Sequence, residues 1–419
     1  MRFLIAAPSS GSGKTTITLG LLRAFAQNGV TISGAKSGPD YIDPRFHEAA
    51  CGQPCFNLDA WAMTPARIIA LAASGNLIVE GAMGLFDGAP PVGKGACANL
   101  ARLLDLPVVL VVDAGRMAQS VAPIVQGFAR FDPTVKIAGV ILNNVGSPRH
   151  EVMLRDALAR IDMRVFGAVP RNGTLGTPSR HLGLVQAQER PDLDAFLDTA
   201  AEIMRQNVDL AALSQLGADT PPPSAPIKPT APAQRIAIAQ DAAFAFAYPH
   251  LLRDWRAAGA TISVFSPLAD EAAPDCDLIY LPGGYPELHA GQLASNTNFI
   301  QSLRKAPEHI EIYGECGGYM ILGETLIDAE GTVHQMAGLL PLGTSFAARK
   351  LHLGYRNVHT TDGPFKGPWK AHEFHYATTL HAKGTPLFDA TDATNAPLPA
   401  MGLRQGRVSG SFAHIIDRA

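Results

Sequence analysis

The stretch Tyr313-Gly314-Glu315-Cys316-Gly317-Gly318-Tyr319 places a cysteine between glycines. The preceding residues, Ile310–Tyr313, alternate and predict a β-strand, and Met320–Leu322 can open a helix. Glycines permit a tight strand-to-helix turn, which would expose the cysteine and leave N–H groups free for an oxyanion. A helix start would also lower the pKa of the thiol, because its dipole favours the thiolate. The stretch therefore predicts a nucleophile elbow, with a buried structural cysteine as the alternative.

Further apolar strands alternate with helical patterns around this stretch. We expect strands at Arg235–Ala239, Thr261–Phe265 and Leu278–Leu281, and a helix over Tyr248–Ala258. The turn Pro282-Gly283-Gly284 follows the third strand. Its N–H groups could face the elbow, so Gly284 and Gly317 are the predicted oxyanion-hole donors, and a plain glycine turn is the alternative.

A thiol nucleophile also needs a base, and three histidines are candidates. His414 follows an expected strand near the end of the chain, and His372 and His375 lie in His-Glu-Phe-His. That spacing is one residue short of the zinc helix H-E-x-x-H, which argues against a metalloprotease.

The N-terminal part carries a phosphate-binding signature. Ala7-Pro8-Ser9-Ser10-Gly11-Ser12-Gly13-Lys14-Thr15-Thr16 follows an apolar strand and opens a helix, as a P-loop does. Pro8 stands where the usual motif has its first glycine, so we expect a variant turn. Backbone N–H groups would wrap the phosphates, Lys14 would reach the terminal ones, and Thr15 would bind Mg²⁺. The predicted nucleotide-binding residues are Ser10, Gly11, Ser12, Gly13, Lys14, Thr15 and Thr16.

The same half has the pattern of a parallel sheet covered by helices on both faces. Expected strands are Phe3–Ala7, Thr31–Lys36, Leu77–Glu80, Val108–Asp113, Ile137–Asn143 and Val165–Val169. Residues 217–233 are rich in proline and alanine and predict an extended linker. We therefore expect a P-loop domain at 1–216, a linker at 217–233 and a second α/β domain at 234–419.

Acids near the expected strand ends are candidates for metal and substrate binding. They are Asp40, Asp43, Glu80, Asp87 and Asp113. Ligands bind at the carboxyl edge of open α/β sheets. Each acid beside Gly or Pro can instead simply form a turn.

The length, composition and net charge of the chain exclude several classes of protein. The 419 residues are 47% hydrophobic, with net charge −3 and no long basic run, so nucleic-acid binding is unsupported. No apolar run approaches the length of a membrane span. The five cysteines are scattered and odd in number, which favours reduced thiols in the cytoplasm. Cys51 and Cys55 are four residues apart, but no Cys or His pair nearby completes a zinc site.

Together these motifs resemble a known family. The second half resembles class I (triad) glutamine amidotransferases of flavodoxin-like fold. The whole chain resembles the cobyrinic and hydrogenobyrinic acid a,c-diamide synthases of cobalamin biosynthesis, with an N-terminal domain similar to dethiobiotin synthetase. The resemblance rests on the P-loop, the elbow and several further stretches. These are Gly38–Pro44, Asn57–Asp59, Glu80–Gly88, Arg180–Leu184, Gln240–Phe244, Pro282–Glu287, His352–Arg356 and His372–Tyr376.

The resemblance implies roles for single residues. Cys316 is the implied glutaminase nucleophile and His414 its partner. Asp40, Asp43, Glu80 and Asp87 match positions that handle ATP, Mg²⁺ and substrate carboxylates, and Thr15, Asp43 and Glu80 are the predicted Mg²⁺ ligands. Class I enzymes carry a glutamate two residues after the histidine, where this chain has Ile416. His414 would then act in a dyad, or be oriented by another acid such as Glu315.

The implied reaction joins two half-reactions. ATP would convert carboxylates of a corrin-type tetrapyrrole to acyl phosphates, and Cys316 would release ammonia from glutamine to amidate them. Because ammonia must arrive unprotonated, we expect the sites to face each other or share a tunnel. Basic residues could receive the substrate's carboxylates, with Lys36, Arg180, Arg349, Lys350 and Arg356 as candidates.

Other interpretations stay open at this point. A cobalt-containing corrin, a cobalt-free corrin and nickel sirohydrochlorin present similar acetate arms. The chain could instead be a P-loop ATPase with a non-catalytic regulatory C-terminal domain, or a thiol hydrolase with a nucleotide-sensing domain. A homodimer is one assembly that we consider.

Overall fold

The computed structural model describes residues 1–73, 75–172, 179–180, 183–184, 186–217 and 229–419. The chain divides into two compact units, Met1–Ile227 and Lys228–Ala419, which are described separately. The division falls within the proline-rich segment 217–233. Most of that segment lies outside the described residues, so its extended conformation stays a prediction.

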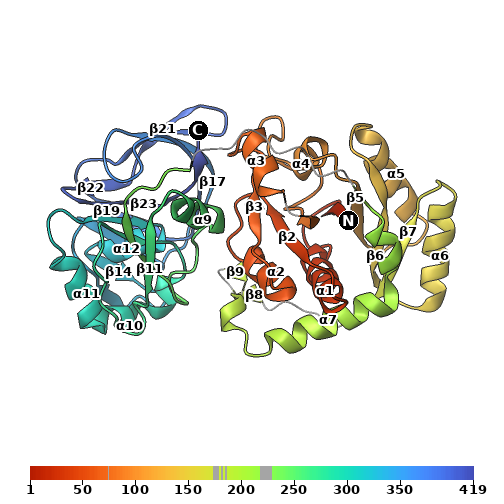
Figure 1. Ribbon diagram of the computed structural model, residues 1–419, viewed down its shortest axis with the longest axis horizontal. Helices are drawn as coiled ribbons and strands as arrows, with labels where there is room; N and C mark the ends of the chain where they lie inside the picture. The colour runs from red at the N-terminus through yellow and green to blue at the C-terminus, as the bar shows by residue number, and fades with distance from the viewer. Residues whose placement is uncertain (74, 173–178, 181–182, 185, 218–228) are drawn as a thin grey trace. The chain divides into compact units, whose positions relative to one another are not determined.

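The first unit contains a seven-stranded parallel sheet with strand order β3-β2-β4-β1-β5-β6-β7 (Figure 1). The strands are β1 (Arg2–Ala6), β2 (Ile32–Ser37), β3 (Phe56–Leu58), β4 (Asn76–Glu80), β5 (Val108–Asp113), β6 (Ile137–Val145) and β7 (Val165–Pro170). The helices are α1 (Lys14–Gln27), α2 (Asp43–Cys51), α3 (Pro65–Leu71), α4 (Cys97–Leu103), α5 (Val121–Phe131), α6 (Pro148–Ala159), α7 (Leu193–Asn207) and α8 (Leu210–Ser214). The expected parallel sheet is confirmed, and β3 is a strand that the sequence pattern did not predict.

Helices cover this sheet on both faces. Parallel strands are joined by right-handed crossovers. The helix between two strands therefore lies on one face of the sheet when the next strand is added toward β3, and on the other face when it is added toward β7. This puts α1 and α2 on one face, where α7 packs against both of them, and α3 to α6 on the other. The apolar side chains of α1 and α7 share one core with alternate residues of the central strands, among them Phe3, Ile5 and Val111.

The central sheet of the second unit has six strands in the order β11-β10-β12-β13-β23-β22. They are β10 (Arg235–Ala239), β11 (Thr261–Phe265), β12 (Leu278–Leu281), β13 (Glu311–Glu315), β22 (Leu403–Gln405) and β23 (Val408–Ser411). All neighbours pair in parallel except β22 and β23. The helices are α9 (Pro249–Ala257), α10 (Ala290–Ser295), α11 (Thr297–Arg304) and α12 (Gly317–Leu322), with a 3₁₀ turn, η3, at Pro286–His289.

Two further sheets in this unit were not predicted. One has the order β15-β14-β16-β19 and the other β21-β20-β17-β18-β24. Their strands are β14 (Thr325–Ile327), β15 (Val333–Gln335), β16 (Leu342–Ser345), β17 (His352–Thr360), β18 (Gly367–His375), β19 (Thr378–Ala382), β20 (Phe388–Asp392), β21 (Pro397–Met401) and β24 (Ala413–Arg418). His372 and His375 therefore lie on a strand and not on a helix, so their residue types do not form a zinc-protease helix.

Neither unit holds a disulfide, since all five cysteines are free thiols and all are buried. Among the described residues, no helix is both long and apolar enough to cross a membrane.

The close approach of α1 to α7 generates a prediction about stability. A Cβ on Gly20 of α1 would lie 2.7 Å from the backbone oxygen of Ala200 in α7. Gly20→Ala should therefore lower the free energy of unfolding by about 1–3 kcal/mol, although alanine is the better helix former. Gly127→Ala in α5 is the matched control. Nothing lies within 4 Å of its added methyl group, so we expect stabilisation of up to about 1 kcal/mol. Urea midpoints measure both, and equal shifts would contradict the packing argument.

Candidate active sites in the two units

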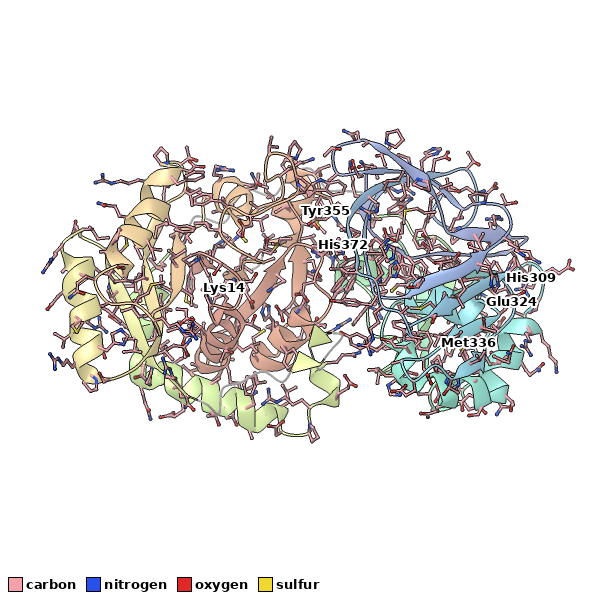
Figure 2. The ribbon with its side chains drawn as sticks, turned by 180° about the vertical axis from the view of Figure 1, so that it is seen from behind. Lys14, His309, Glu324, Met336, Tyr355 and His372 are labelled. Atoms are coloured by element: carbon pink, nitrogen blue, oxygen red, sulfur yellow. The ribbon has the colours of Figure 1, made fainter. Side chains whose placement is uncertain are left out.

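The P-loop lies between β1 and α1, as its sequence predicts. Gly13 precedes α1 with φ 89°, a left-handed conformation that favours glycine. The Nζ atom of Lys14 donates to the backbone oxygens of Ser9, at 3.3 Å, and Met83, at 2.7 Å. Lys14 is labelled beside the sheet in Figure 2. Met83 has φ 54°, which is unusual for a residue with a side chain and typical of a constrained site.

An asparagine that the motif does not include supports the loop. The Nδ2 atom of Asn143, on β6, donates to the Ser12 backbone oxygen at 3.0 Å. A Cβ on Gly13 would lie 2.1 Å from the same Nδ2 atom. The second glycine of the loop is therefore required by its conformation and by this close approach.

A buried charge cluster lies beside the P-loop. Glu80, fully buried at the end of β4, accepts hydrogen bonds from the Thr15 hydroxyl at 2.6 Å and from Lys36 Nζ at 2.7 Å. Its other oxygen lies 2.7 Å from Nε2 of His47. Lys36 also donates to Asp43 at 2.5 Å. The cluster thus joins α1, β2, α2 and β4, and the sequence reasoning missed His47.

The charges of this cluster depend on one another. Burial favours neutral Glu80, but Lys36 and His47 outweigh it and hold the pKa of Glu80 well below its usual range. Burial and the neighbouring Asp40 raise the pKa of Asp43 to about 7, against the opposing effect of Lys36. Burial lowers the pKa of Lys14, and Lys36 lowers it further. A phosphate group bound here would offset the positive charges of Lys14 and Lys36, because it adds negative charge beside both lysines.

Two of the predicted acids have local contacts that explain them as turn formers. Oδ1 of Asp40 accepts from the backbone N–H groups of Ile42 and Asp43, and so supports the first turn of α2. Asp87 accepts from the N–H of Gly84 at 2.9 Å, in the loop that packs against Pro8. Their catalytic roles stay predictions. Asp113, at the end of β5, is exposed and accepts from Gly115.

The candidate carboxylate receptors separate into different environments. Lys36 is buried and paired with Asp43 and Glu80, and its contact with a substrate carboxylate stays a prediction. Arg356 is paired with Glu373. Arg349 and Lys350 are exposed. The side chain of Arg180 lies outside the described part of the chain.

In the second unit, Cys316 occupies the predicted elbow between β13 and α12. Its φ of 45° and ψ of −100° are strained for a residue with a side chain. The positions around Cys316 are glycines because other backbone atoms lie too close for a side chain. A Cβ on Gly318 would lie 2.0 Å from the oxygen of Leu281, and one on Gly314 would lie 2.6 Å from the backbone of Gly318. A structural cysteine would not require this strained turn.

The glycine loop after β12 and His414 lie close to the elbow. A Cβ on Gly317 would lie 3.2 Å from the backbone nitrogen of Gly284, so the two predicted oxyanion donors are near neighbours. A Cβ on Gly283 would lie 2.2 Å from Cε1 of His414. His414 is buried on β24 and is paired in register with His372 on β18.

An acid for His414 comes from the residue before the nucleophile. Oε2 of Glu315 lies 3.5 Å from Nδ1 of His414. Glu315 is buried and is fixed by the Tyr280 hydroxyl at 2.8 Å and by the N–H of Ile415 at 3.1 Å. Ile416, which stands where class I enzymes have their glutamate, is fully buried. The geometry therefore favours Glu315 among the alternatives that the sequence left open.

The thiol of Cys316 is not activated at rest. Burial raises its pKa above the usual value, and the carboxylates of Glu287, Glu315 and Glu373 add to this rise. The expected lowering by the helix start is wrong, because α12 is short and acids surround the sulfur. The resting group is a thiol, so its proton has to leave as the nucleophile attacks.

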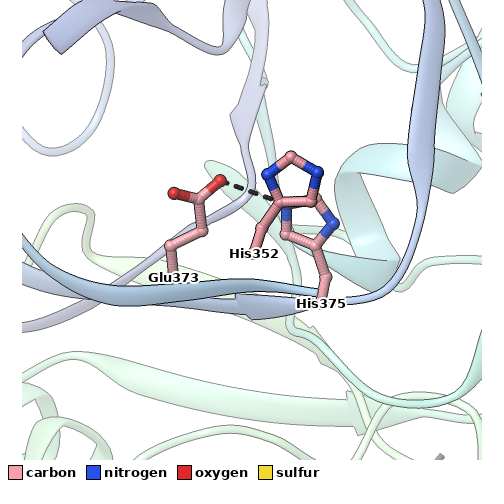
Figure 3. Close-up of side chains that lie close together, drawn as sticks. All are labelled: His352, Glu373 and His375. Atoms are coloured by element: carbon pink, nitrogen blue, oxygen red, sulfur yellow. Dashed lines mark hydrogen bonds and ion pairs between the residues drawn. The ribbon is translucent and has the colours of Figure 1, made fainter. Parts of the chain in front are cut away.

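Three side chains of β17 and β18, those of His352, Glu373 and His375, form a cluster (Figure 3). Nε2 of His375 lies 3.1 Å from Glu373, and Arg356 holds the other oxygen of this carboxylate at 2.8 Å. His352, Glu373 and His375 have donor atoms within 4.8 Å of one another. The two imidazoles, however, stack nearly parallel, at 3°, whereas a shared metal ion would have to lie in both ring planes. The cluster is therefore a hydrogen-bonded support for the β17–β18 ribbon, whose Phe374 backbone oxygen lies 4.0 Å from the sulfur of Cys316.

The chain matches two family models. Residues 235–418 match the CobB/CobQ-like glutamine amidotransferase domain, and residues 3–185 match the CobQ/CobB/MinD/ParA nucleotide binding domain.

Similar proteins match along almost the whole chain. One from Brucella suis biovar 1 is 55% identical, and the match spans 99% of this chain and 98% of that protein. One from Rhizobium meliloti is 54% identical over the same shares, and one from Rhodobacter capsulatus is 51% identical over 98% of each. All three are named hydrogenobyrinate a,c-diamide synthase. The chain therefore belongs to the hydrogenobyrinate a,c-diamide synthases, a family of ATP-dependent glutamine amidotransferase ligases of cobalamin biosynthesis.

Proposed function

We propose that this chain amidates the a and c acetate groups of hydrogenobyrinic acid, with one ATP and one glutamine for each amide. The observation that carries the proposal is that one chain holds both a P-loop beside a buried acid cluster and a strained cysteine elbow beside a histidine and an acid. The names of the relatives favour the cobalt-free corrin over a cobalt-containing corrin or nickel sirohydrochlorin. The strain at Cys316 argues against a regulatory C-terminal domain with a structural cysteine.

In the glutaminase half, Cys316 would attack the side-chain amide of glutamine. The thiol proton passes to His414, whose ring Glu315 orients. The N–H groups of Gly284 and Gly317 stabilise the oxyanion. His414 then returns the proton to the leaving nitrogen, ammonia departs, and water hydrolyses the γ-glutamyl thioester. The raised pKa of Cys316 keeps the thiol neutral until this transfer.

In the ligase half, a carboxylate oxygen of the substrate would attack the γ-phosphorus of ATP, and ADP leaves. The resulting acyl phosphate reacts with ammonia, and phosphate leaves as the amide forms. Lys14 stabilises the charge that develops on the transferred phosphoryl group. Lys36 and His47 keep Glu80 ionised and fix its direction beside Thr15.

The residues beside the P-loop fit a magnesium ion. Oδ1 of Asp43 is buried and accepts no hydrogen bond within the described residues. The Thr15 hydroxyl and the Glu80 carboxylate supply further oxygens, which Mg²⁺ prefers. We propose that Thr15, Asp43 and Glu80 would hold it. When bound, Mg²⁺ neutralises phosphate charge during transfer.

We further propose that Glu287 recognises the α-ammonium group of glutamine. Glu287 follows the oxyanion loop in η3 and lies close enough to Cys316 to raise the pKa of its thiol. Burial raises the pKa of Glu287 to about 7, and Arg349 partly opposes this rise. Because Arg349 is near, it is our candidate for the α-carboxylate of the same substrate.

Two single mutations should each abolish one half-reaction and leave the other measurable. Cys316→Ser should remove glutamine-driven diamide formation but leave formation from added ammonia, because only the ammonia source is lost. Lys14→Ala should remove amidation from both donors but leave glutamine hydrolysis measurable. Mass spectrometry of the corrin product with ATP and Mg²⁺ measures both variants. Glutamine-driven synthesis by Cys316→Ser would refute the proposed function.

The acid that orients His414 can be tested by a near-isosteric change. Glu315→Gln should lower kcat/KM for glutamine hydrolysis by about a hundredfold or more, since losing an orienting acid acts on this scale. Ammonia-driven synthesis and the unfolding temperature should stay close to the parent values, which separates this loss from misfolding. A change of less than threefold in glutamine hydrolysis would remove Glu315 from the triad.

Glutamine recognition by Glu287 predicts a pH dependence. The carboxylate accepts the ammonium group only when ionised, so KM for glutamine should fall as pH rises through about 7. Glu287→Gln should raise KM by about ten- to a hundredfold, the loss of a charge-assisted hydrogen bond, and flatten this pH dependence. Glu330→Gln, an exposed change, is the matched control and should leave KM unchanged. An unchanged pH profile in Glu287→Gln would contradict the assignment.

A further inference from the structure

Two thiols that neither half-reaction uses lie side by side in the first unit. Cys51 is the last residue of α2, Gly52 turns the chain with φ 67°, and Cys55 directly precedes β3. Their sulfur atoms are 3.7 Å apart. Cys51 is 8% exposed and Cys55 is fully buried. Both thiols are therefore buried, and Cys51 alone of the pair retains a small exposed fraction.

The two thiols differ in acidity. The hydrogen bond from Cys55 lowers the pKa of Cys51 to about 6, with the Gln53 backbone adding to this and burial opposing it. Burial raises the pKa of Cys55. A thiolate next to a thiol is the arrangement of an attacking and a resolving cysteine. The pKa values of Cys97, Cys276 and Cys316 are all raised, so Cys51 is the one thiol of the five whose pKa is lowered.

We propose that Cys51 and Cys55 are a thiol modification site, at which a hydroperoxide forms a reversible disulfide that switches off the ATP-dependent half-reaction. The Cys51 thiolate attacks a peroxide oxygen, the O–O bond breaks, and a sulfenic acid forms. The sulfur of Cys55 attacks the sulfenic sulfur, the S–O bond breaks, and the oxygen leaves as water. Two thiols and one hydrogen peroxide thus give one disulfide and two waters, and a dithiol reductant reverses the change.

The disulfide would act on the buried charge cluster through α2. This helix begins at Asp43 and carries His47, the partner of Glu80, one turn before Cys51. The sulfur of Cys55 and Cβ of His47 both pack against Gly34 of β2, at 3.1 and 2.9 Å from the position of an added Cβ. A disulfide has an S–S length of about 2.05 Å, so its formation draws the end of α2 toward the start of β3. Because both groups pack against Gly34, we expect this movement to shift His47 relative to Glu80.

The loop before α2 is also linked to β3, the strand that follows Cys55. Asn57, two residues after Cys55, donates to the backbone oxygens of Gly38 at 2.8 Å and Asp40 at 2.6 Å. A displacement of β3 therefore reaches the loop that leads into Asp43. The inhibitory effect rests on the proposed function, whereas the formation of the disulfide does not.

The chemistry is tested by counting thiols after treatment with hydrogen peroxide, with alkylation under denaturing conditions and peptide mass mapping. We expect two of the five thiols to be lost, a cross-linked Cys51–Cys55 peptide lighter by two hydrogens, and recovery with dithiothreitol. Cys51→Ser and Cys55→Ser should form no such link, and Cys276→Ser should form it as the parent does. Retention of five thiols, or oxygen addition without a cross-link, would overturn the proposal.

The consequence is tested in the Cys316→Ser background with ammonia as donor, so that oxidation of the nucleophile plays no part. The oxidised protein should lose at least about tenfold in amidation rate, and dithiothreitol should restore it. The further change Cys55→Ser should make the rate insensitive to peroxide. A disulfide that forms with an unchanged rate refutes the switch. Failure of the proposed function itself is distinguishable, because the reduced protein would then form no amide while the thiol count still changes.

Discussion

In each unit, chemistry depends on the constraint that neighbouring parallel strands end at the same edge of a sheet. In the first unit, β2, β4 and β1 are adjacent, so Lys36, Glu80 and the P-loop meet although they are far apart in sequence. In the second, β12, β13 and β23 are adjacent, so the glycine loop, the elbow and the chain that leads to His414 meet in the same way. The side chains that cover the two sheets serve mainly to keep these strand ends fixed.

Burial gives both sites their electrostatic character. Glu80 is ionised within the protein only because Lys36 and His47 compensate for its lost hydration, so the cluster cannot lose one member without disturbing the others. Around Cys316 burial again disfavours the charged form, but here the neighbouring carboxylates add to this effect and the pKa of the thiol is raised. The cluster beside the P-loop is therefore charged at rest, whereas the thiol of Cys316 is protonated. Such a resting thiol is suited to a protein that should not hydrolyse glutamine without need.

Much of the fold and of the chemical groups could be predicted from local patterns. Most strands of the two central sheets, the P-loop and the cysteine elbow are contiguous patterns that can be read along the chain, whereas β3 and β22 were not predicted. The antiparallel sheets of the second unit could not be predicted, because the pairing of strands such as β18 and β24 joins residues that are distant in sequence. The partners His47 and Asn143 have no local motif, and only their contacts reveal them. Asp40 and Asp87 could not be assigned from the pattern, since an acid beside a glycine or a proline has the same local pattern whether it binds a ligand or supports a turn.

The sequence by itself determined the fold class, the motifs that contain Lys14 and Cys316, and the family to which the chain belongs, because these depend on residues that are adjacent along the chain. Only the tertiary structure decided the environment of those groups. It placed Glu315 beside His414, committed Lys36 to Asp43 and Glu80, and reversed the expected direction of the pKa of Cys316. The physical reason is that protonation and orientation depend on burial and on charges from other strands. These are set by packing and not by neighbours in sequence.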